Sequence, residues 1–223
     1  MTDRIETGSG EQTAMRNVSP GRRPCPSMSD RRVRLPVGHF VGEAWYLVSQ
    51  CRAYRYRFVR MWDSRKPRLG VVGHSWSVGS EWRTDATVRR CIEFARAWGY
   101  GGIDVGNLYG IQPRRLTSAA DPIGPNNDQH LAAMRADNDL IVLAWGTQAH
   151  PTRAHAVAEM LRNLSDHRGG SLAVLGWTEC GQPQHPLHVP KDSTPECLTL
   201  GAEGYGLHEA EDPRWGRLLA GET

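Results

Sequence analysis

Four short apolar runs, separated by segments with helical periodicity, constrain the fold of this chain more than any other feature. The runs are RLGVVG (68–73), GIDVGNLYG (102–110), NDLIVLAWG (138–146) and SLAVLGW (171–177). Each is short, rich in apolar residues and close to a glycine, which is typical of strands buried on both faces. Helices are expected between them, over 84–101, from Asn126 or Asn127 to about Asp137, and from Pro151 onward. The alternation predicts an α/β fold, a three-layer sandwich around a mainly parallel four-stranded sheet.

The flanking segments follow other patterns. Residues 54–61, YRYRFVRM, alternate large apolar side chains with arginine, which predicts an added antiparallel strand with one solvated face. Residues 1–35 are rich in Ser, Gly, Pro and Arg, and we expect a disordered tail. We expect a single α/β domain over 36–197 and an irregular C-terminal tail over 198–223.

Composition excludes some classes of protein. With 39% hydrophobic and 23% charged residues, the chain is typical of a globular protein. We see no secretory signal and no apolar run near the roughly 20 residues that a membrane helix needs, so we expect no membrane partner. The five cysteines form no CxxC pair, and their odd number favours a reducing cytoplasm. A net charge of +3 does not by itself require a nucleic-acid partner.

Motifs for the common cofactor and nucleotide sites are absent. The sequence has no GxSxG, Walker loop, GxGxxG or HExxH, which argues against P-loop hydrolases, dinucleotide enzymes and zincins. Cys180, His185, His188 and Cys197 are metal-ligating types, but their spacing fits no known metal motif. We therefore expect neither a metal nor a cofactor.

Polar and aromatic residues gather where the predicted strands end. In an open α/β sheet, ligands bind beyond the carboxyl ends of the strands. The four ends here are GHSWS (73–77), NLYG (107–110), WGTQ (145–148) and CGQPQHPLH (180–188). Each candidate also has a structural interpretation: Asn107 as a turn cap, Asp85 as a helix cap, Trp145 as a core residue and His185 as a brace between prolines.

The motifs YRYRFVRMWD, TDATVRRCIEFARAWGYG, NLYG, DPIGPNND, LAWG and GQPQHPL resemble those of a bacterial and phage family known as domain of unknown function 1643. The resemblance covers about residues 50–190 and implies no established activity. The family usually reads close to LNPSTAD where this chain reads VGHSWSV. Gly73 and His74 thus replace an Asn-Pro pair, while Ser75 is retained, so the ligand or the chemistry can differ from that of the relatives.

The order of the motifs also resembles the uracil-DNA glycosylase superfamily. That superfamily has a loop after its first core strand, an Asn at the end of the next, an apolar strand ending in Gly, and a late His-Pro element. The counterparts here are GHSWS, Asn107, IVLAWG and His185-Pro186-Leu187. The resemblance implies that Asn107 reads a base edge, that His185 supports the leaving base, and that loop 186–189 enters the DNA groove. This second resemblance concerns the fold and the order of the motifs, and such a likeness does not by itself establish a function.

We therefore expect an N-glycosidase or related base-processing enzyme acting on a nucleic acid or nucleotide. Its catalytic candidates are His74, Asp85 and His185, with His74 or Asp85 activating water. Its substrate-binding candidates are Ser75, Trp76, Arg90, Asn107, Tyr109, Trp145 and His188, of which the aromatic residues would stack on a flipped base. Arg89, Arg114 and Arg115 join Arg90 as candidates for phosphate contacts. Two alternatives stay open: a non-catalytic nucleic-acid or nucleotide binding module, and a small-molecule biosynthetic enzyme.

Overall fold

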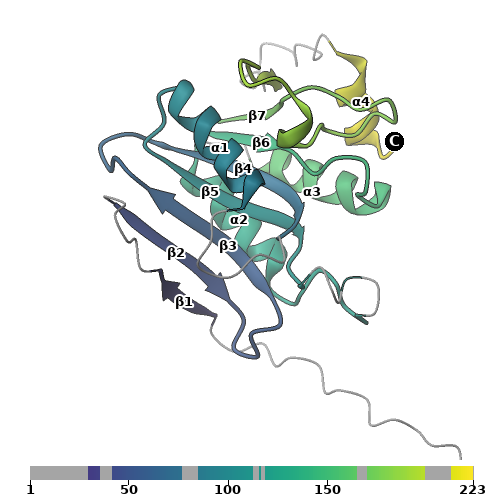
Figure 1. Ribbon diagram of the computed structural model, residues 1–223. Helices are drawn as coiled ribbons and strands as arrows, with labels where there is room; N and C mark the ends of the chain where they lie inside the picture. Colours follow the sequence, from purple (N-terminus) through teal and green to yellow (C-terminus); the bar gives the residue numbers. More distant parts are fainter. Residues whose placement is uncertain are drawn as a thin grey trace, which may run out of the picture.

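The computed structural model describes residues 30–35, 42–76, 85–112, 116, 119–164, 170–198 and 212–222. In these ranges the chain forms one eight-stranded mixed sheet flanked by helices (Figure 1). The strands are β1 (Arg31–Arg34), β2 (Glu43–Val48), β3 (Arg55–Met61), β4 (Arg68–Ser75), β5 (Gly102–Tyr109), β6 (Leu140–Leu143), β7 (Ser171–Val174) and β8 (Glu196–Leu198). The helices are α1 (Ala86–Ala97), α2 (Asn127–Asp137), α3 (Pro151–Asn163), α4 (Pro213–Ala220) and the short 3₁₀ helix η2 (Pro186–His188).

The sheet order is β1-β2-β3-β5-β4-β6-β7-β8. The central strands β5, β4, β6 and β7 run parallel, and their carboxyl ends lie at one edge of the sheet. On one side β3, β2 and β1 continue the sheet with antiparallel pairing, and β8 closes the other side in the same way.

The predicted sheet was wrong in its extent and in its strand directions. In the described sheet, three of the seven strand pairs are parallel and four are antiparallel, so this is not a mainly parallel four-stranded sandwich with one added strand. We missed β1 because RRVR has only one apolar residue. We missed β2 because nearly all of EAWYLV is buried, which removes the period-two alternation of a half-exposed strand.

Helices cover both faces of the sheet (Figure 1). The helix α1 packs on one face through Cys91, Phe94 and Ala95, against alternate residues of the central strands such as Ile103 and Val142. The helices α2, α3 and α4 build the core of the other face. Because successive side chains of a strand point to opposite faces, apolar residues at every position of β6 supply both cores.

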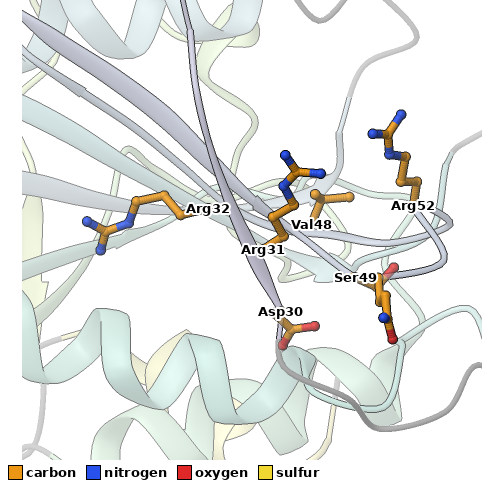
Figure 2. A pocket seen from close by; sticks show the side chains of 7 residues that line it. Asp30, Arg31, Arg32, Val48, Ser49 and Arg52 are labelled. Atoms are coloured by element: carbon orange, nitrogen blue, oxygen red, sulfur yellow. The ribbon is translucent and has the colours of Figure 1, made fainter.

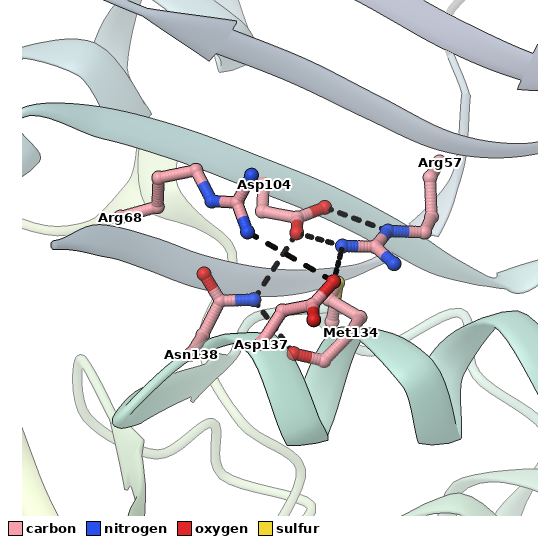
Figure 3. A network of polar contacts seen from close by, with 6 residues as sticks. All are labelled: Arg57, Arg68, Asp104, Met134, Asp137 and Asn138. Atoms are coloured by element: carbon pink, nitrogen blue, oxygen red, sulfur yellow. Dashed lines mark hydrogen bonds and ion pairs between the residues drawn. The ribbon is translucent and has the colours of Figure 1, made fainter. Parts of the chain in front are cut away.

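A buried ionic network joins the strands to the end of α2 (Figure 3). Asp104 of β5 is fully buried and accepts hydrogen bonds from the Arg57 guanidinium of β3, one of them with an Nε–Oδ1 distance of 3.1 Å. Asn138 Nδ2 donates to Asp104 Oδ2 at 3.1 Å, and Arg57 also pairs with Asp137 at 2.9 Å. The network links β3, β5 and the end of α2, and it gives the buried charges of Arg57 and Asp104 partners.

Two terminal elements lie outside the domain limits that we expected. The strand β1 falls within 1–35, the predicted tail, where Asp30 Oδ2 accepts hydrogen bonds from His130 Nε2 and Asn126 Nδ2. The helix α4 falls within 198–223, and its Trp215 packs edge-on against Trp177 with 5.1 Å between ring centroids. None of the helices in the described ranges has the length and apolar character needed to cross a membrane.

Candidate functional site

The candidate site lies at the edge of the sheet where the parallel strands end. It is formed by the ends of β4 and β5, the loop after β6, the residue that caps the N-terminus of α1 and the loop that follows β7. The 3₁₀ helix η2 packs against α1, which brings the late histidine segment to the same edge as the N-terminus of that helix. Residues far apart in the sequence therefore meet here.

His74 lies at the end of β4 with both ring nitrogens engaged. Its Nε2 is 3.1 Å from the backbone oxygen of Gln148, and its Nδ1 is 3.2 Å from Ser75 Oγ. Because a carbonyl oxygen only accepts, Nε2 carries the proton, and Nδ1 of the neutral ring accepts from the Ser75 hydroxyl. Burial lowers the pKa of His74, so the ring is neutral at pH 7 and Nδ1 is a base. The Tyr109 ring packs edge-on against His74 at 5.1 Å.

His185 is held by a loop that is itself well anchored. The Gly146 backbone N–H donates to the Pro183 carbonyl at 2.9 Å, and Gln184 N donates to Gly176 O at 2.9 Å. Gly146 has φ +75°, and a Cβ there would lie 3.3 Å from His185 Cβ, so glycine permits both the turn after β6 and this close approach. Leu187 N donates to His185 Nδ1 at 3.3 Å, which leaves the proton of the neutral imidazole on Nε2.

The surroundings of His185 keep it neutral. Burial lowers the pKa of His185, and repulsion from His188 and His74 lowers it further, while Asp85 acts in the opposite direction. The His185 and His188 rings lie 5.4 Å apart, and His188 is exposed. The His188 ring is thus a neighbour of His185, and His74 and Asp85 are close enough to change the energy of its charged form.

Asp85 caps the helix α1. Its Oδ1 accepts a hydrogen bond from Val88 N at 2.7 Å, which is the usual geometry of an N-cap. The capping interpretation is therefore confirmed. Because its charge also acts on His185, the carboxylate lies close to the candidate site as well.

Asn107 lies near the end of β5, with 7% of its surface exposed. Within the part of the chain that the structure describes, its side-chain amide forms no hydrogen bond. Its register partner on β4 is Gly73, where a Cβ would lie 2.9 Å from Asn107 Oδ1. A nearly buried amide with no partner among the described residues is a candidate contact for a ligand, because buried polar groups usually have hydrogen-bond partners.

Two residues that sequence reasoning missed hold the end of β5 in place. Asn127 is fully buried, and its Nδ2 donates to the backbone oxygens of Asn107 and Leu108 at 3.0 and 3.2 Å. Arg153 Nε also donates to Leu108 O at 3.0 Å, and its guanidinium pairs with Asp128. We expected Asn126 or Asn127 to cap a helix, and Asn126 is the N-cap residue of α2, although its side chain forms no cap hydrogen bond. Only the tertiary structure shows this positioning role.

Three predicted binding residues have other partners. Trp145 is 2% exposed in the core, where its Nε1 donates to Gln182 Oε1 at 2.7 Å, so it offers no stacking surface. Trp76 Nε1 donates to Gly110 O at 2.9 Å, and the Arg55 guanidinium lies 4.2 Å from the centre of its ring. Arg90 lies on α1 over Phe94 and pairs with Glu93 at 3.6 Å.

The remaining predictions concern phosphates and metals. Arg89 is exposed on α1, whereas Arg114 and Arg115 lie outside the described residues. No group of three His, Cys, Asp or Glu side chains in the described ranges is placed to hold a metal ion. The Gln148 carbonyl, which orients His74, is a contact that no sequence pattern indicates.

The fold and the site define an α/β protein with a histidine-lined site at the carboxyl edge of its parallel strands. The chain belongs to the family described as "Protein of unknown function (DUF1643)", whose model matches residues 55–187. The match spans every predicted site residue except His188, and it excludes β1, β2, β8 and α4. No curated protein and no solved structure matches the chain. The resemblance to the uracil-DNA glycosylase superfamily is not confirmed.

Proposed function

We propose that this protein hydrolyses the N-glycosidic bond of a base in a nucleic acid or nucleotide. The observation that carries the proposal is the Asn107 amide, which has no hydrogen-bond partner among the described residues and lies at the same sheet edge as two neutral histidines with different hydrogen-bonding roles. His74 presents a base at Nδ1, and His185 presents a donor at Nε2. Cleavage of a glycosidic bond needs both kinds of group, one near the sugar and one near the leaving base.

The leaving base departs with the electron pair of the bond, so negative charge develops on it. A preorganised donor that faces this charge lowers the barrier. His185 is suited to this role because Leu187 N engages its Nδ1 and leaves Nε2–H free to donate. The Asn107 amide offers both a donor and an acceptor, which is the combination that reads the edge of a base.

Water attack completes the reaction. The water oxygen bonds to the anomeric carbon of the sugar as the bond from that carbon to the base nitrogen breaks. The proton of the water passes to Ser75 Oγ while the Ser75 proton passes to His74 Nδ1, along the 3.2 Å contact between them. The Gln148 carbonyl accepts from His74 Nε2 and stabilises the imidazolium that forms. His185 keeps its proton and only donates a hydrogen bond, and the departed base takes up a proton from solvent, to which the His74 imidazolium also returns its proton.

The test is release of free bases from single-stranded, duplex and modified-base-rich DNA, measured by mass spectrometry and by alkali-labile sites. We expect release by the wild-type protein and none by His185→Ala or Asn107→Ala. His155→Gln, on α3 outside the site, is the control and retains release. Full activity of both site variants would refute the proposal. Binding without any release would favour the non-catalytic binding module.

One observation favours a second candidate, a small-molecule hydrolase with Ser75 as nucleophile. The hydroxyl of Ser75, the imidazole of His74 and the Gln148 carbonyl form a chain in which a nucleophile meets a base and the base meets an orienting group. This mechanism predicts a covalent adduct on Ser75 with an activated ester, detectable by intact-mass measurement. Hydrolysis by a water molecule that Ser75 and His74 activate predicts no covalent adduct on Ser75.

A further inference from the structure

A hollow of about 470 Å³ lies between β1 and the hairpin that joins β2 to β3 (Figure 2). Its lining includes Arg31, Arg52, Ser49 and Gln50. Figure 2 shows Arg31 and Arg52 extending on the same side of the hairpin, while Arg32 points away. Arg32 instead stacks on Trp45, with 4.1 Å from the guanidinium carbon to the ring centre. The hollow thus presents two guanidinium groups beside short polar side chains.

The two arginines lack a compensating charge in the part of the chain that the structure describes. Asp30 is the acidic residue of the lining, and its Oδ2 is engaged by His130 Nε2 at 2.6 Å and Asn126 Nδ2 at 2.8 Å. Uncompensated guanidinium groups recognise phosphate, because their planar fork matches its oxygens. The chemistry of the hollow therefore favours a phosphate.

The backbone at Arg52 supports a functional role. Arg52 has φ +55°, the only positive φ of a non-glycine residue in the described ranges, and its N–H donates to Ser49 O at 2.9 Å. This conformation is uncommon for a residue with a long side chain, and Gly or Asn is the usual choice at such a turn. Strain of this kind concentrates at ligand clamps.

The hollow opens at the same end of the sheet as the candidate site. Arg31 pairs with Val48 at the end of β2, and Arg55 N, at the start of β3, donates to Gly110 O just after β5. Arg55 in turn covers Trp76, which directly follows β4. Because β3 and β5 lie between β2 and β4, these two strands are three strand spacings apart, a distance of about 14 Å. Arg55 and Trp76 thus lie at this end of the sheet between β2 and His74. Proteins that bind single-stranded nucleic acid combine the same two kinds of side chain, basic and aromatic.

From this arrangement we infer that the hollow between β1 and β2 binds backbone phosphates of a single-stranded polynucleotide. The inference rests on the proposed function, because it identifies the substrate of the histidine site as a polynucleotide rather than a free nucleotide. The hollow is built from residues 30–52, which lie outside the match to the family model.

The test is equilibrium binding of a fluorescein-labelled single-stranded DNA of about 12 nucleotides, followed by anisotropy. Binding is measured between about 50 and 200 mM salt for the wild-type protein and for Arg31→Gln/Arg52→Gln. Loss of two phosphate contacts reduces the slope of log affinity against log salt by about 1.4, and we expect affinity at low salt to fall on the order of tenfold. The variant Arg31→Lys/Arg52→Lys restores the slope, because it restores the charge.

The matched control is Arg162→Gln/Arg217→Gln, which removes the same charge from α3 and α4, far from β1 (Figure 1). We expect this control to bind like the wild-type protein, and thermal melting verifies that every variant is folded. The inference would be overturned if Arg31→Gln/Arg52→Gln had the same slope of log affinity against log salt as the wild-type protein. It would also be overturned if the control variant lost as much affinity for the oligonucleotide. A wild-type protein that binds inorganic phosphate but not the oligonucleotide would overturn it as well.

Base release from the same oligonucleotide separates the two claims. Weakened binding in Arg31→Gln/Arg52→Gln, without base release by the wild-type protein, would support the phosphate site and contradict the proposed function. Base release by the wild-type protein, with unchanged binding in the variant, would support the function and contradict the phosphate site.

Discussion

Gly73 of β4 and Asn107 of β5 are register partners, and a Cβ on residue 73 would come within 2.9 Å of Asn107 Oδ1. Because Gly73 has no side chain, the Asn107 amide can occupy its position without a steric clash. The position of the Asn107 amide thus depends on the glycine at residue 73.

Gly73→Ala should impair the site more than the fold. The added methyl group displaces the Asn107 amide, and a misplacement of this kind costs on the order of 10- to 100-fold in turnover. The measurement is base release, with far-ultraviolet circular dichroism and melting to verify folding. Gly216→Ala on α4 is the control, because nothing lies within 4 Å of its Cβ, and it should stabilise the protein by about 1 kcal/mol.

Asn107→Ala and Asn127→Ala should differ in their effect on stability. Asn107→Ala removes no hydrogen bond to a described residue, so we expect its free energy of unfolding to stay within about 1 kcal/mol of wild type. Asn127→Ala removes two buried hydrogen bonds, to the backbone oxygens of Asn107 and Leu108, and should cost about 2 kcal/mol even though Arg153 still donates to Leu108 O. Urea denaturation measures both. Equal losses would mean that Asn107 has a structural role in the free protein.

Acidification should weaken the protein through His74 and His185. Burial is the main reason that the pKa of each lies below the usual value of 6.5, so the unfolded chain takes up protons before the folded chain does. This contribution to the free energy of unfolding is present above about pH 6.5 and is lost as the pH falls toward the lowered pKa values. Urea denaturation at several pH values should show a smaller loss for His185→Gln. Base release should fall in the same direction, because a protonated His74 accepts no proton.

Asp104→Ala should strongly destabilise the fold. The substitution leaves the buried Arg57 guanidinium without its main partner (Figure 3), and breaking a buried pair in this way costs about 3–5 kcal/mol. Thermal and urea unfolding measure the loss. Arg65→Ala is the control, because Arg65 is exposed and pairs with Asp63 only at the surface, and its melting temperature should equal that of wild type. A stable Asp104→Ala protein would show that the network is dispensable.

The cysteines should differ in reactivity. Burial raises the pKa of the Cys91 thiol to about 12, whereas Cys180 is exposed after β7. Alkylation requires the thiolate, so iodoacetamide at about pH 8 should modify Cys180 and spare Cys91 in the folded protein. Peptide mass spectrometry measures both, and unfolding in urea should remove the difference. Rapid labelling of native Cys91 would contradict the packing of α1.

Much of the central architecture could be predicted from the sequence. The stripe of Val88, Cys91 and Ala95 indicated α1, and the apolar runs indicated β4, β5, β6 and β7, because burial on both faces demands uninterrupted apolar residues. The same reasoning placed His74, Asn107 and His185 at one edge of the sheet. The edge strand β1 and its neighbour β2 escaped prediction, since RRVR has almost no apolar content and EAWYLV does not alternate.

The sequence by itself determined which residue types reach the ends of the core strands, because strand and helix periodicities are local properties of the chain. Only the tertiary structure decided which of them meet. It buried Trp145 behind Gln182, covered Trp76 with Arg55, and placed Asp85 and His188 beside His185. It also decided the chemistry: the proton positions on His74 and His185 follow from the Gln148 carbonyl and the Leu187 N–H. Burial and hydrogen bonding are set by neighbours from distant parts of the chain, and no local pattern encodes them.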